Sequence, residues 1–261
     1  MTDTAPSAPG SSGAPPDGPL TLTLDIGGTG LKAGLLDARG GMVGSRERVK
    51  TPHPSTPGAI VPDLLGLAAK FAGYDRVSVG FPGVVRGGTI RTAPNLGTEA
   101  WAGFDLGDTL QQALHRPVRM LNDARVQGLG VISGKGLECV ITLGTGMGFA
   151  LYQDGRLAPH FEMGQHPARK GLTYDEYVGK AALDKAGRKR WLRRVEKVLE
   201  QMRTLLNFDV LYIGGGDAAL IDFEVPADVR IVSNDAGITG GVKLWDPRLD
   251  DVFAHSAVLA S

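Results

Sequence analysis

The sequence predicts a mixed α/β protein made of two similarly built lobes. Apolar strands alternate with helical segments along the chain, which is the pattern of α/β architecture. A strand, a glycine-rich turn and a second strand also occur twice, once near the start and once near the middle of the chain. With 261 residues, of which 42% are hydrophobic, the chain is long enough to bury a core in each lobe.

The first hairpin follows a low-complexity segment. Residues 1–19 consist almost entirely of Ala, Pro, Ser, Gly, Thr and Asp, and because they offer little apolar surface to bury, we expect a disordered tail. Leu and Thr then alternate from Leu20 to Asp25, which predicts a strand, and residues 31–36 form its partner. The turn between them is Gly27-Gly28-Thr29-Gly30.

The second hairpin runs from Cys139 to Tyr152 and has Gly144-Thr145-Gly146-Met147-Gly148 at its tip. The repetition predicts lobes at residues 20–121 and 122–261, with a helix near the C-terminus as a candidate to return to the first lobe. Other elements follow from the hydrophobic pattern. We expect helices near 60–71 and 172–200, strands at 77–80, 118–121 and 210–213, and a tight loop at Gly214-Gly215-Gly216.

Charge, cysteine content and hydropathy exclude several classes of protein. The 28 basic and 28 acidic residues cancel, so no overall field favours nucleic acid or an anionic membrane as a partner. Cys139 is the only cysteine, which excludes an internal disulfide and a multi-cysteine zinc site. No segment has the roughly 18 consecutive apolar residues of a membrane span, and no signal-peptide pattern is present. We expect a cytoplasmic protein, and the sequence leaves a homodimer open.

The two glycine-rich tips are suited to a polyphosphate chain. Glycine lets backbone N–H groups approach phosphate oxygens without a Cβ in the way. Either tip alone is more often a tight turn, and neither has P-loop spacing or the full dinucleotide pattern. Their pairing on matching hairpins, with hydroxyls from Thr29 and Thr145, favours phosphate binding. Asp25 ends the first strand, where it could hold a water molecule of a Mg²⁺ ion that bridges donor phosphates.

Three motifs together resemble the ROK family of sugar kinases and repressors. They are Asp25-Ile26-Gly27-Gly28-Thr29-Gly30-Leu31-Lys32, Leu121-Asn122-Asp123-Ala124 and Leu143-Gly144-Thr145-Gly146-Met147-Gly148. Within that family, further segments resemble the polyphosphate glucokinase branch most closely. These are Gly80-Phe81-Pro82-Gly83-Val84-Val85, Arg91-Thr92-Ala93-Pro94-Asn95, Trp101 and Asn234-Asp235-Ala236-Gly237-Ile238.

The resemblance implies an actin-like (ribonuclease H-like) two-lobe sugar kinase fold with a hexose, glucose in the first place, in the cleft between the lobes. It implies phosphoryl transfer from inorganic polyphosphate, ATP or both to the sugar 6-hydroxyl, with Mg²⁺ as cofactor. The candidate donor-binding residues are Asp25, Gly27, Gly28, Thr29, Gly30, Lys32, Gly144, Thr145, Gly146, Gly148, Gly215 and Gly216.

Asp123 is the candidate catalytic residue. It ends a strand and starts a helix, which is a common position for polar groups that face a cleft in α/β folds. From the residues alone it could equally cap that helix. The resemblance implies that Asp123 is the base that accepts the hydroxyl proton, and that the sugar is bound by Asn95, Asn122, Asp123, Glu162, His166 and Glu176.

The chain departs from the family in one sugar motif. Phe161-Glu162-Met163-Gly164-Gln165-His166 resembles the family's Glu-x-Gly-His, but Gln165 stands at the histidine position. Either the loop shifts so that His166 binds the sugar in place of the family histidine, or the Gln165 amide binds it. The preferred hexose therefore stays open. The interval before Glu176 contains no cysteine-rich loop, so we expect no structural zinc, as in polyphosphate glucokinases.

A local excess of positive charge lies at residues 180–203. The nine basic residues are Lys180, Lys185, Arg188, Lys189, Arg190, Arg193, Arg194, Lys197 and Arg203, against three acidic ones. An anionic polymer could bind along such a segment. The alternative is the solvated face of a helix whose apolar residues, such as Trp191 and Val195, face the core.

The sequence therefore predicts a hexose kinase. Two alternatives remain: an ATP-only kinase for another hexose or an amino sugar, which Gln165 would suit, and a non-catalytic, sugar-responsive member of the family. A regulator would need a DNA-binding unit, and only the low-complexity residues 1–19 precede the first strand. A binding protein without catalysis is disfavoured because Asp123 and both glycine tips are present.

Overall fold

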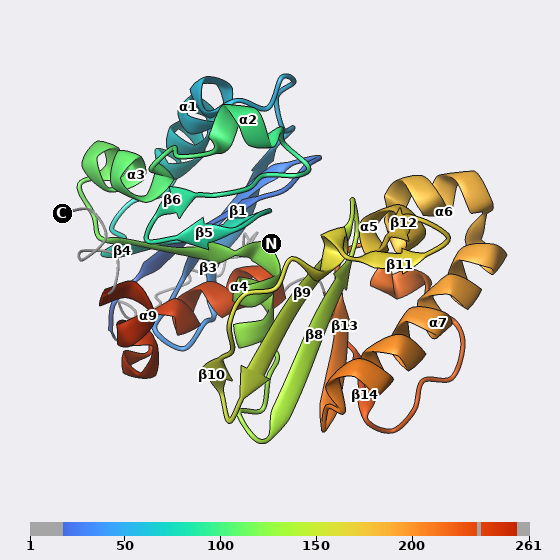
Figure 1. Ribbon diagram of the computed structural model, residues 1–261. Helices are drawn as coiled ribbons and strands as arrows, with labels where there is room; N and C mark the ends of the chain where they lie inside the picture. Colours follow the sequence, from blue (N-terminus) through green and yellow to red (C-terminus); the bar gives the residue numbers. More distant parts are fainter. Residues whose placement is uncertain (1–17, 234–235, 255–261) are drawn as a thin grey trace, which may run out of the picture.

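The first glycine-tipped hairpin opens a five-stranded sheet (Figure 1). Its strands are β1 (Thr21–Ile26), β2 (Leu31–Leu36), β3 (Met42–Val49), β4 (Arg76–Phe81) and β7 (Val118–Asn122). The order across the sheet is β3-β2-β1-β4-β7. Strands β3, β2 and β1 pair antiparallel, whereas β4 and β7 run parallel to β1.

The second hairpin opens a sheet with the same plan. Its strands are β8 (Leu137–Leu143), β9 (Met147–Gln153), β10 (Arg156–Leu157), β13 (Val210–Gly214) and β14 (Val229–Ile231). The order across this sheet is β10-β9-β8-β13-β14. Strands β10, β9 and β8 pair antiparallel, whereas β13 and β14 run parallel to β8. The prediction of a mixed α/β fold with two similarly built lobes is confirmed.

The computed structural model describes residues 18–233 and 236–254. The expected disordered tail at 1–19 lies outside the described residues, apart from Gly18 and Pro19. The same holds for Asn234 and Asp235 of the sequence motif noted above.

The core of the first lobe lies on the leucine face of β1. Leu22, Leu24 and Ile26 are at most 1% exposed and belong to one cluster with apolar residues of α1 and α3. The lobe's helices are α1 (Pro57–Ala68), α2 (Thr98–Trp101) and α3 (Leu106–Leu114), and a short hairpin joins β5 (Val85–Arg86) to β6 (Thr89–Ile90).

The threonine face of β1 is also buried, because the end of the chain returns to cover it. The returning elements are α8 (Ala236–Thr239), η3 (Gly240–Trp245), η4 (Pro247–Leu249) and α9 (Asp250–Ala254). Ser78 Oγ donates to the Gly241 carbonyl at 2.7 Å and accepts from Trp245 Nε1 at 2.9 Å. A Cβ at Gly241 would overlap Thr23, so only glycine permits this close approach. We therefore assign residues 236–254 to the first lobe.

The second lobe contains the largest departure from the predicted secondary structure. The segment expected to be helical, 172–200, is helical over most of its length but is not continuous. The segment divides into β12 (Leu172–Thr173), α5 (Tyr174–Val178), α6 (Lys180–Ala186) and α7 (Arg188–Leu206). The breaks fall at Gly179, where a Cβ would overlap the Asp175 and Thr145 carbonyls, and at Gly187, which has a φ of 75°.

No helix in the described part of the chain has the length and apolar character needed to cross a membrane.

Helix α4 (Asp123–Leu129) lies between the two sheets (Figure 1). It continues directly from β7 and contacts β4 of the first lobe, β9 of the second and the returning η3. Asn122 caps it, since Asn122 Oδ1 accepts from the backbone N–H of Ala124 at 3.0 Å and of Arg125 at 3.3 Å. The start of α4 is therefore held at a fixed position where the two lobes meet.

Candidate active site between the lobes

A cavity of about 450 Å³ lies between the lobes, and both lobes contribute to its walls. The first lobe contributes the β1–β2 tip and the carboxyl end of β7, and the second contributes the β8–β9 tip and the start of α6. The segment 161–165, which includes the short helix η1 (Met163–Gln165), and the loop after β13 complete it. All twelve candidate donor-binding residues line this cavity.

The two glycine tips face each other. A Cβ built on Gly28 would lie 3.4 Å from Thr145 Oγ1 of the opposite tip. Each tip is closed by a backbone hydrogen bond of 3.1 Å, from Gly27 N to Gly30 O and from Gly144 N to Gly146 O. The geometry thus brings two sets of backbone N–H groups and threonine hydroxyls to one end of the cavity, where they can contact an extended anion.

The glycines of the second tip differ in what surrounds them. A Cβ on Gly144 would meet no atom within 4 Å, and the same is true of Gly216 in the loop after β13. A Cβ on Gly146, by contrast, would collide with the carboxylate of Asp175. Gly144 and Gly216 therefore face open space, whereas Gly146 is needed because a side chain packs against it.

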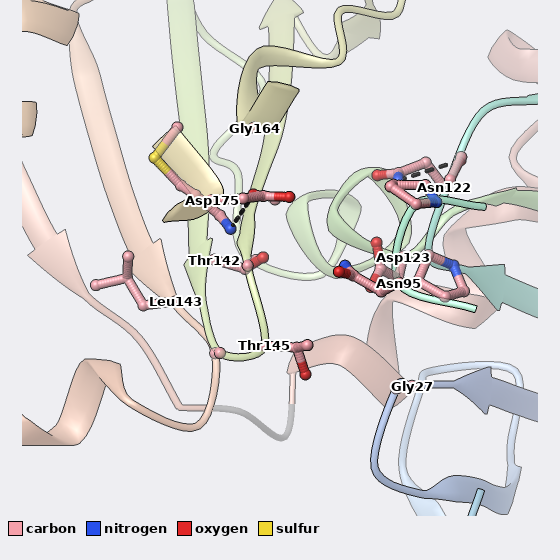
Figure 2. A pocket seen from close by; sticks show the side chains of 18 of the residues that line it. Gly27, Asn95, Asn122, Asp123, Thr142, Leu143, Thr145, Gly164 and Asp175 are labelled. Atoms are coloured by element: carbon pink, nitrogen blue, oxygen red, sulfur yellow. Dashed lines mark hydrogen bonds between the residues drawn. The ribbon is translucent and has the colours of Figure 1, made fainter. Parts of the chain in front are cut away.

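Asp123 projects into the cavity from the first residue of α4 (Figure 2). A Cβ on Gly80 of the neighbouring β4 would lie 3.4 Å from Asp123 Cα and 3.6 Å from Asp25 Oδ1, so these two acidic residues flank the same glycine. Burial, with a further contribution from the Asp25 charge, raises the pKa of Asp123 from 3.8 to about 7. A carboxylate with such a pKa can accept a proton near neutral pH.

Asp25 is held by one partner. Lys32, which is opposite Asp25 in the β1–β2 register, donates from Nζ to Asp25 Oδ2 at 2.9 Å. Asp25 Oδ1 makes no hydrogen bond to any other residue within 18–233 and 236–254 and lies, like Asp123, beside Gly80. One carboxylate oxygen is thus available for a ligand at the boundary between the two tips and Asp123.

Four of the six candidate sugar-binding residues line the cavity: Asn95, Asn122, Asp123 and Glu162. Figure 2 shows Asn95 beside Asp123, with Asp175 on the opposite wall. Asn122 is largely occupied by structure, because besides capping α4 it donates from Nδ2 to the Gly83 carbonyl at 3.3 Å. Glu162 Oε1 lies 2.6 Å from His160 Nε2.

His166 and Glu176 are not among the residues that line the cavity, and their role as sugar ligands stays a prediction. The His166 ring stacks on Tyr174, and its Nδ1 lies 3.0 Å from the Pro167 carbonyl. Glu176 forms a capping box with Thr173: Glu176 Oε2 accepts from Thr173 N at 2.9 Å, and Thr173 Oγ1 accepts from Glu176 N at 3.2 Å. The carboxylate therefore caps α5 from its exposed side.

The neighbours of His166 and Glu176 in the sequence, Gln165 and Asp175, lie at the cavity instead. Gln165 Nε2 donates to Asp175 Oδ2 at 2.7 Å, and both residues line the cavity. Asp175 Oδ1 also accepts from Met147 N at 2.7 Å, which ties α5 to the β8–β9 tip. Burial, together with the nearby Glu162 charge, raises the pKa of Asp175.

Four charged residues that line the cavity were not among the predicted site residues: Arg48, Asp175, Lys180 and Asp217. Asp175 could have been considered from the sequence because it is adjacent to Glu176 in the first turn of a helix. Adjacent residues of a helix face different sides, so only one of the two can point into the cavity. Arg48 lies in β3, where nothing in the alternating pattern marks it as special. Lys180 appeared in the sequence only as part of the basic segment, although its backbone N–H bonds to Gly144 O at 2.8 Å.

Comparisons with known proteins identify the family and the fold. Residues 21–166 match the ROK family. A polyphosphate glucokinase of Mycobacterium tuberculosis (strain CDC 1551 / Oshkosh) is 31% identical over 257 residues, covering 92% of this chain and 96% of the relative. The inorganic polyphosphate/ATP-glucomannokinase from Arthrobacter sp. strain KM has a TM-score of 0.79 and 29% identity, covering 87% of this chain and 98% of that one. A ROK family glucokinase from Streptomyces griseus, in complex with glucose and AMPPNP, has a TM-score of 0.73 and 21% identity, covering 86% and 98%. The predicted ROK resemblance and sugar kinase fold are confirmed.

Proposed function

The chain belongs to the ROK family, and we propose that it is a hexose kinase that transfers a phosphoryl group from inorganic polyphosphate or ATP to the 6-hydroxyl of a hexose such as glucose. The observation that carries the proposal is Asp123, a half-buried carboxylate whose pKa is raised to about 7, in a cavity shared with two facing glycine tips. The names of the similar proteins support the substrate class.

In the proposed reaction, Asp123 accepts the proton of the sugar hydroxyl as its oxygen attacks the terminal phosphorus of the donor. The bond from that phosphorus to the bridging oxygen breaks, and the shortened donor leaves with the electron pair. Asn95, Glu162, Gln165 and Asp175 offer acceptors and donors to the sugar hydroxyls. The two tips hold the donor phosphates in line with the attacking oxygen.

Mg²⁺ is part of this proposal, and Asp25 is the residue that would hold it through water. The free oxygen of Asp25 fits such a role. Within the described residues, no group of three His, Cys, Asp or Glu side chains is arranged to hold a metal ion, so the donor phosphates would supply further ligands. A bound Mg²⁺ would neutralise charge on the transferring phosphoryl group.

The first test is a coupled assay of wild-type and Asp123→Ala protein with ATP and long-chain polyphosphate on glucose, mannose, fructose and amino sugars. We expect turnover of glucose with at least one donor. In Asp123→Ala, kcat should fall by about 10²- to 10⁴-fold because the general base is lost. Glucose binding, measured by calorimetry, should change little because the other polar groups of the cavity remain.

Asp63→Asn, on the outer helix α1, is the matched control and should keep wild-type activity. Near-native kcat in Asp123→Ala would remove Asp123 as the base. Absence of turnover with every donor and sugar, while glucose still binds, would contradict the kinase proposal as a whole.

A further inference from the structure

A second cavity, of about 750 Å³, is separate from the candidate active site. Its walls come from the β5–β6 hairpin, the first turns of α3, strand β7, the segment 157–160 and α9. Arg125 of α4 lines this cavity, whereas Asp123 lines the first. Because successive residues of a helix are about 100° apart, side chains two positions apart leave nearly opposite sides of α4.

Three arginines line the second cavity, and none of them forms an ion pair with a carboxylate within residues 18–233 and 236–254. They are Arg86, Arg91 and Arg125. Arg125 is the most enclosed. Its side chain makes one hydrogen bond, from Nη2 to the Ala158 carbonyl at 2.9 Å, although a guanidinium has five N–H donors.

Burying a guanidinium without a counter-charge is unfavourable, because the loss of its hydration lowers the stability of the folded state. The pKa of Arg125 is lowered chiefly by burial, and no carboxylate contributes to offset it. An anion bound in the cavity would offset this desolvation penalty. Charge-assisted hydrogen bonds to phosphate oxygens are strong, and the planar guanidinium can form two of them side by side.

The remaining polar groups of the cavity are suited to hydroxyls. Asp105 and Asp108 lie at the start of α3, where Asp105 Oδ1 accepts from Asp108 N at 2.8 Å, and Gln111 follows one turn later. Asp105 Oδ2 and Asp108 Oδ1 retain acceptor capacity, because Asp108 Oδ2 is the atom that accepts from Gln112. His160 also lines the cavity, but its Nε2 is engaged with Glu162 of the first cavity.

We propose that the second cavity binds a phosphorylated polyol, a hexose phosphate in size and chemistry, with its phosphate on Arg86, Arg91 and Arg125 and its hydroxyls on Asp105, Asp108 and Gln111. Binding at this site does not require catalysis, so its test is independent of the proposed function. A free phosphate ion shares the anionic group but lacks the hydroxyls.

The test is calorimetric titration with glucose 6-phosphate, inorganic phosphate and glucose, using the full chain without a phosphoryl donor. In the wild-type protein we expect two binding events for glucose 6-phosphate, one displaced by glucose and one not. The event that glucose does not displace should weaken by about tenfold or more in Arg125→Met and in the double variant Arg86→Gln, Arg91→Gln. Arg39→Gln, an exposed arginine elsewhere, is the matched control and should keep both events.

The double variant keeps the test valid if Arg125→Met disturbs folding, because Arg86 and Arg91 are exposed. A single event in the wild-type protein that glucose displaces completely would overturn the proposal. So would an unchanged second event in the double variant. Equal affinity of this event for inorganic phosphate and glucose 6-phosphate would overturn the assignment of the hydroxyl-binding wall.

Discussion

Asp123 owes its chemical properties to its surroundings. Burial comes first among the causes of its raised pKa, and the charge of Asp25 comes second. Both effects favour the protonated form, yet a base must be deprotonated to act. The residue therefore titrates close to neutral pH, far from the ordinary range of an aspartate.

The acid limb of the rate profile should report this pKa. We expect kcat/KM for glucose to fall about tenfold per pH unit below a midpoint near 7, because only deprotonated Asp123 accepts the proton. In Asp25→Asn, assayed at saturating donor, the remaining activity should have its midpoint at lower pH, since one cause of the raised pKa is gone. A wild-type midpoint near 4, the value of an unperturbed carboxylate, would contradict the assignment.

The same environment predicts a gain of stability in Asp123→Asn. Because the pKa is higher in the folded state than the unfolded value of 3.8, the folded state binds more protons between about pH 4 and 7, and its stability decreases as pH rises through that window. Asn removes the buried charge. We expect Tm to rise by about 2 °C or more at pH 8 and by less at pH 5, measured by calorimetry. An equal change at both pH values would show that charge burial is not the cause.

The sequence located the cavity-lining residues of the glycine tips better than those of the sugar motif. Gln165 and Asp175 line the cavity, but the sequence pointed to their neighbours His166 and Glu176. In a one-turn 3-10 helix or the first turn of an α-helix, adjacent residues point to different sides, and both candidates in each pair can bind a sugar. Only the packing of Asp175 between Gly146 and Gly164 decides the register, and that packing joins segments far apart in sequence.

At the scale of elements, the β8–β9 tip combines two functions in one short turn. Gly144 borders open cavity, whereas Gly146 makes room for the Asp175 carboxylate. Under the proposed function, we therefore expect the glycines of one motif to serve different substrates: the donor at Gly144 and, through Asp175, the sugar at Gly146. The sequence could identify the tip as glycine-rich, but not which glycine serves which purpose.

This division can be tested by adding a Cβ at each position. Gly144→Ala should raise the KM for the donor by about tenfold and leave the KM for glucose nearly unchanged, because its methyl group enters space that we assign to phosphate. Gly146→Ala should raise the KM for glucose more than that for the donor, because it displaces Asp175. Gly66→Ala on α1, which also meets no atom within 4 Å, is the control. Parallel changes of both KM values in Gly144→Ala would favour a purely structural turn.

At the scale of the whole molecule, the repeated hairpin and the order of motifs were sufficient to predict a two-lobe α/β fold. The elements that depend on long-range packing were less predictable. The breaks at Gly179 and Gly187 interrupt a strongly helical pattern, and Gly179 is needed for its close approach to the β8–β9 tip of the same lobe. The second cavity could not be predicted at all, because its walls come from five separate segments of the chain.

The function of the basic segment at 180–203 depends on where its charges lie relative to the candidate active site. Four of its nine cations have partners: Lys180 with Asp184, Arg188 with Asp222, Arg194 with the Tyr177 carbonyl, and Arg203 with Asp228. The other five are exposed and form no ion pair with a described residue; they are Lys185, Lys189, Arg190, Arg193 and Lys197. Lys180 also lines the cavity, so the segment begins at the candidate active site and leads away from it.

A long anion in the cavity could therefore continue onto these exposed cations, while ATP would fill only the cavity. We expect the triple variant Arg190→Gln, Arg193→Gln, Lys197→Gln to lower kcat/KM for long-chain polyphosphate by about tenfold or more and that for ATP by less than twofold. Added salt should produce the same asymmetry in the wild-type protein, because contacts to several exposed cations are screened and lose their counterion-release contribution together. The control triple variant Arg39→Gln, Lys135→Gln, Lys243→Gln removes the same charge at exposed positions elsewhere and should affect neither donor selectively. If ATP and polyphosphate lose activity in parallel, or if polyphosphate is no donor, the segment is a solvated helix face whose Trp191 and Val195 pack in the core of the second lobe.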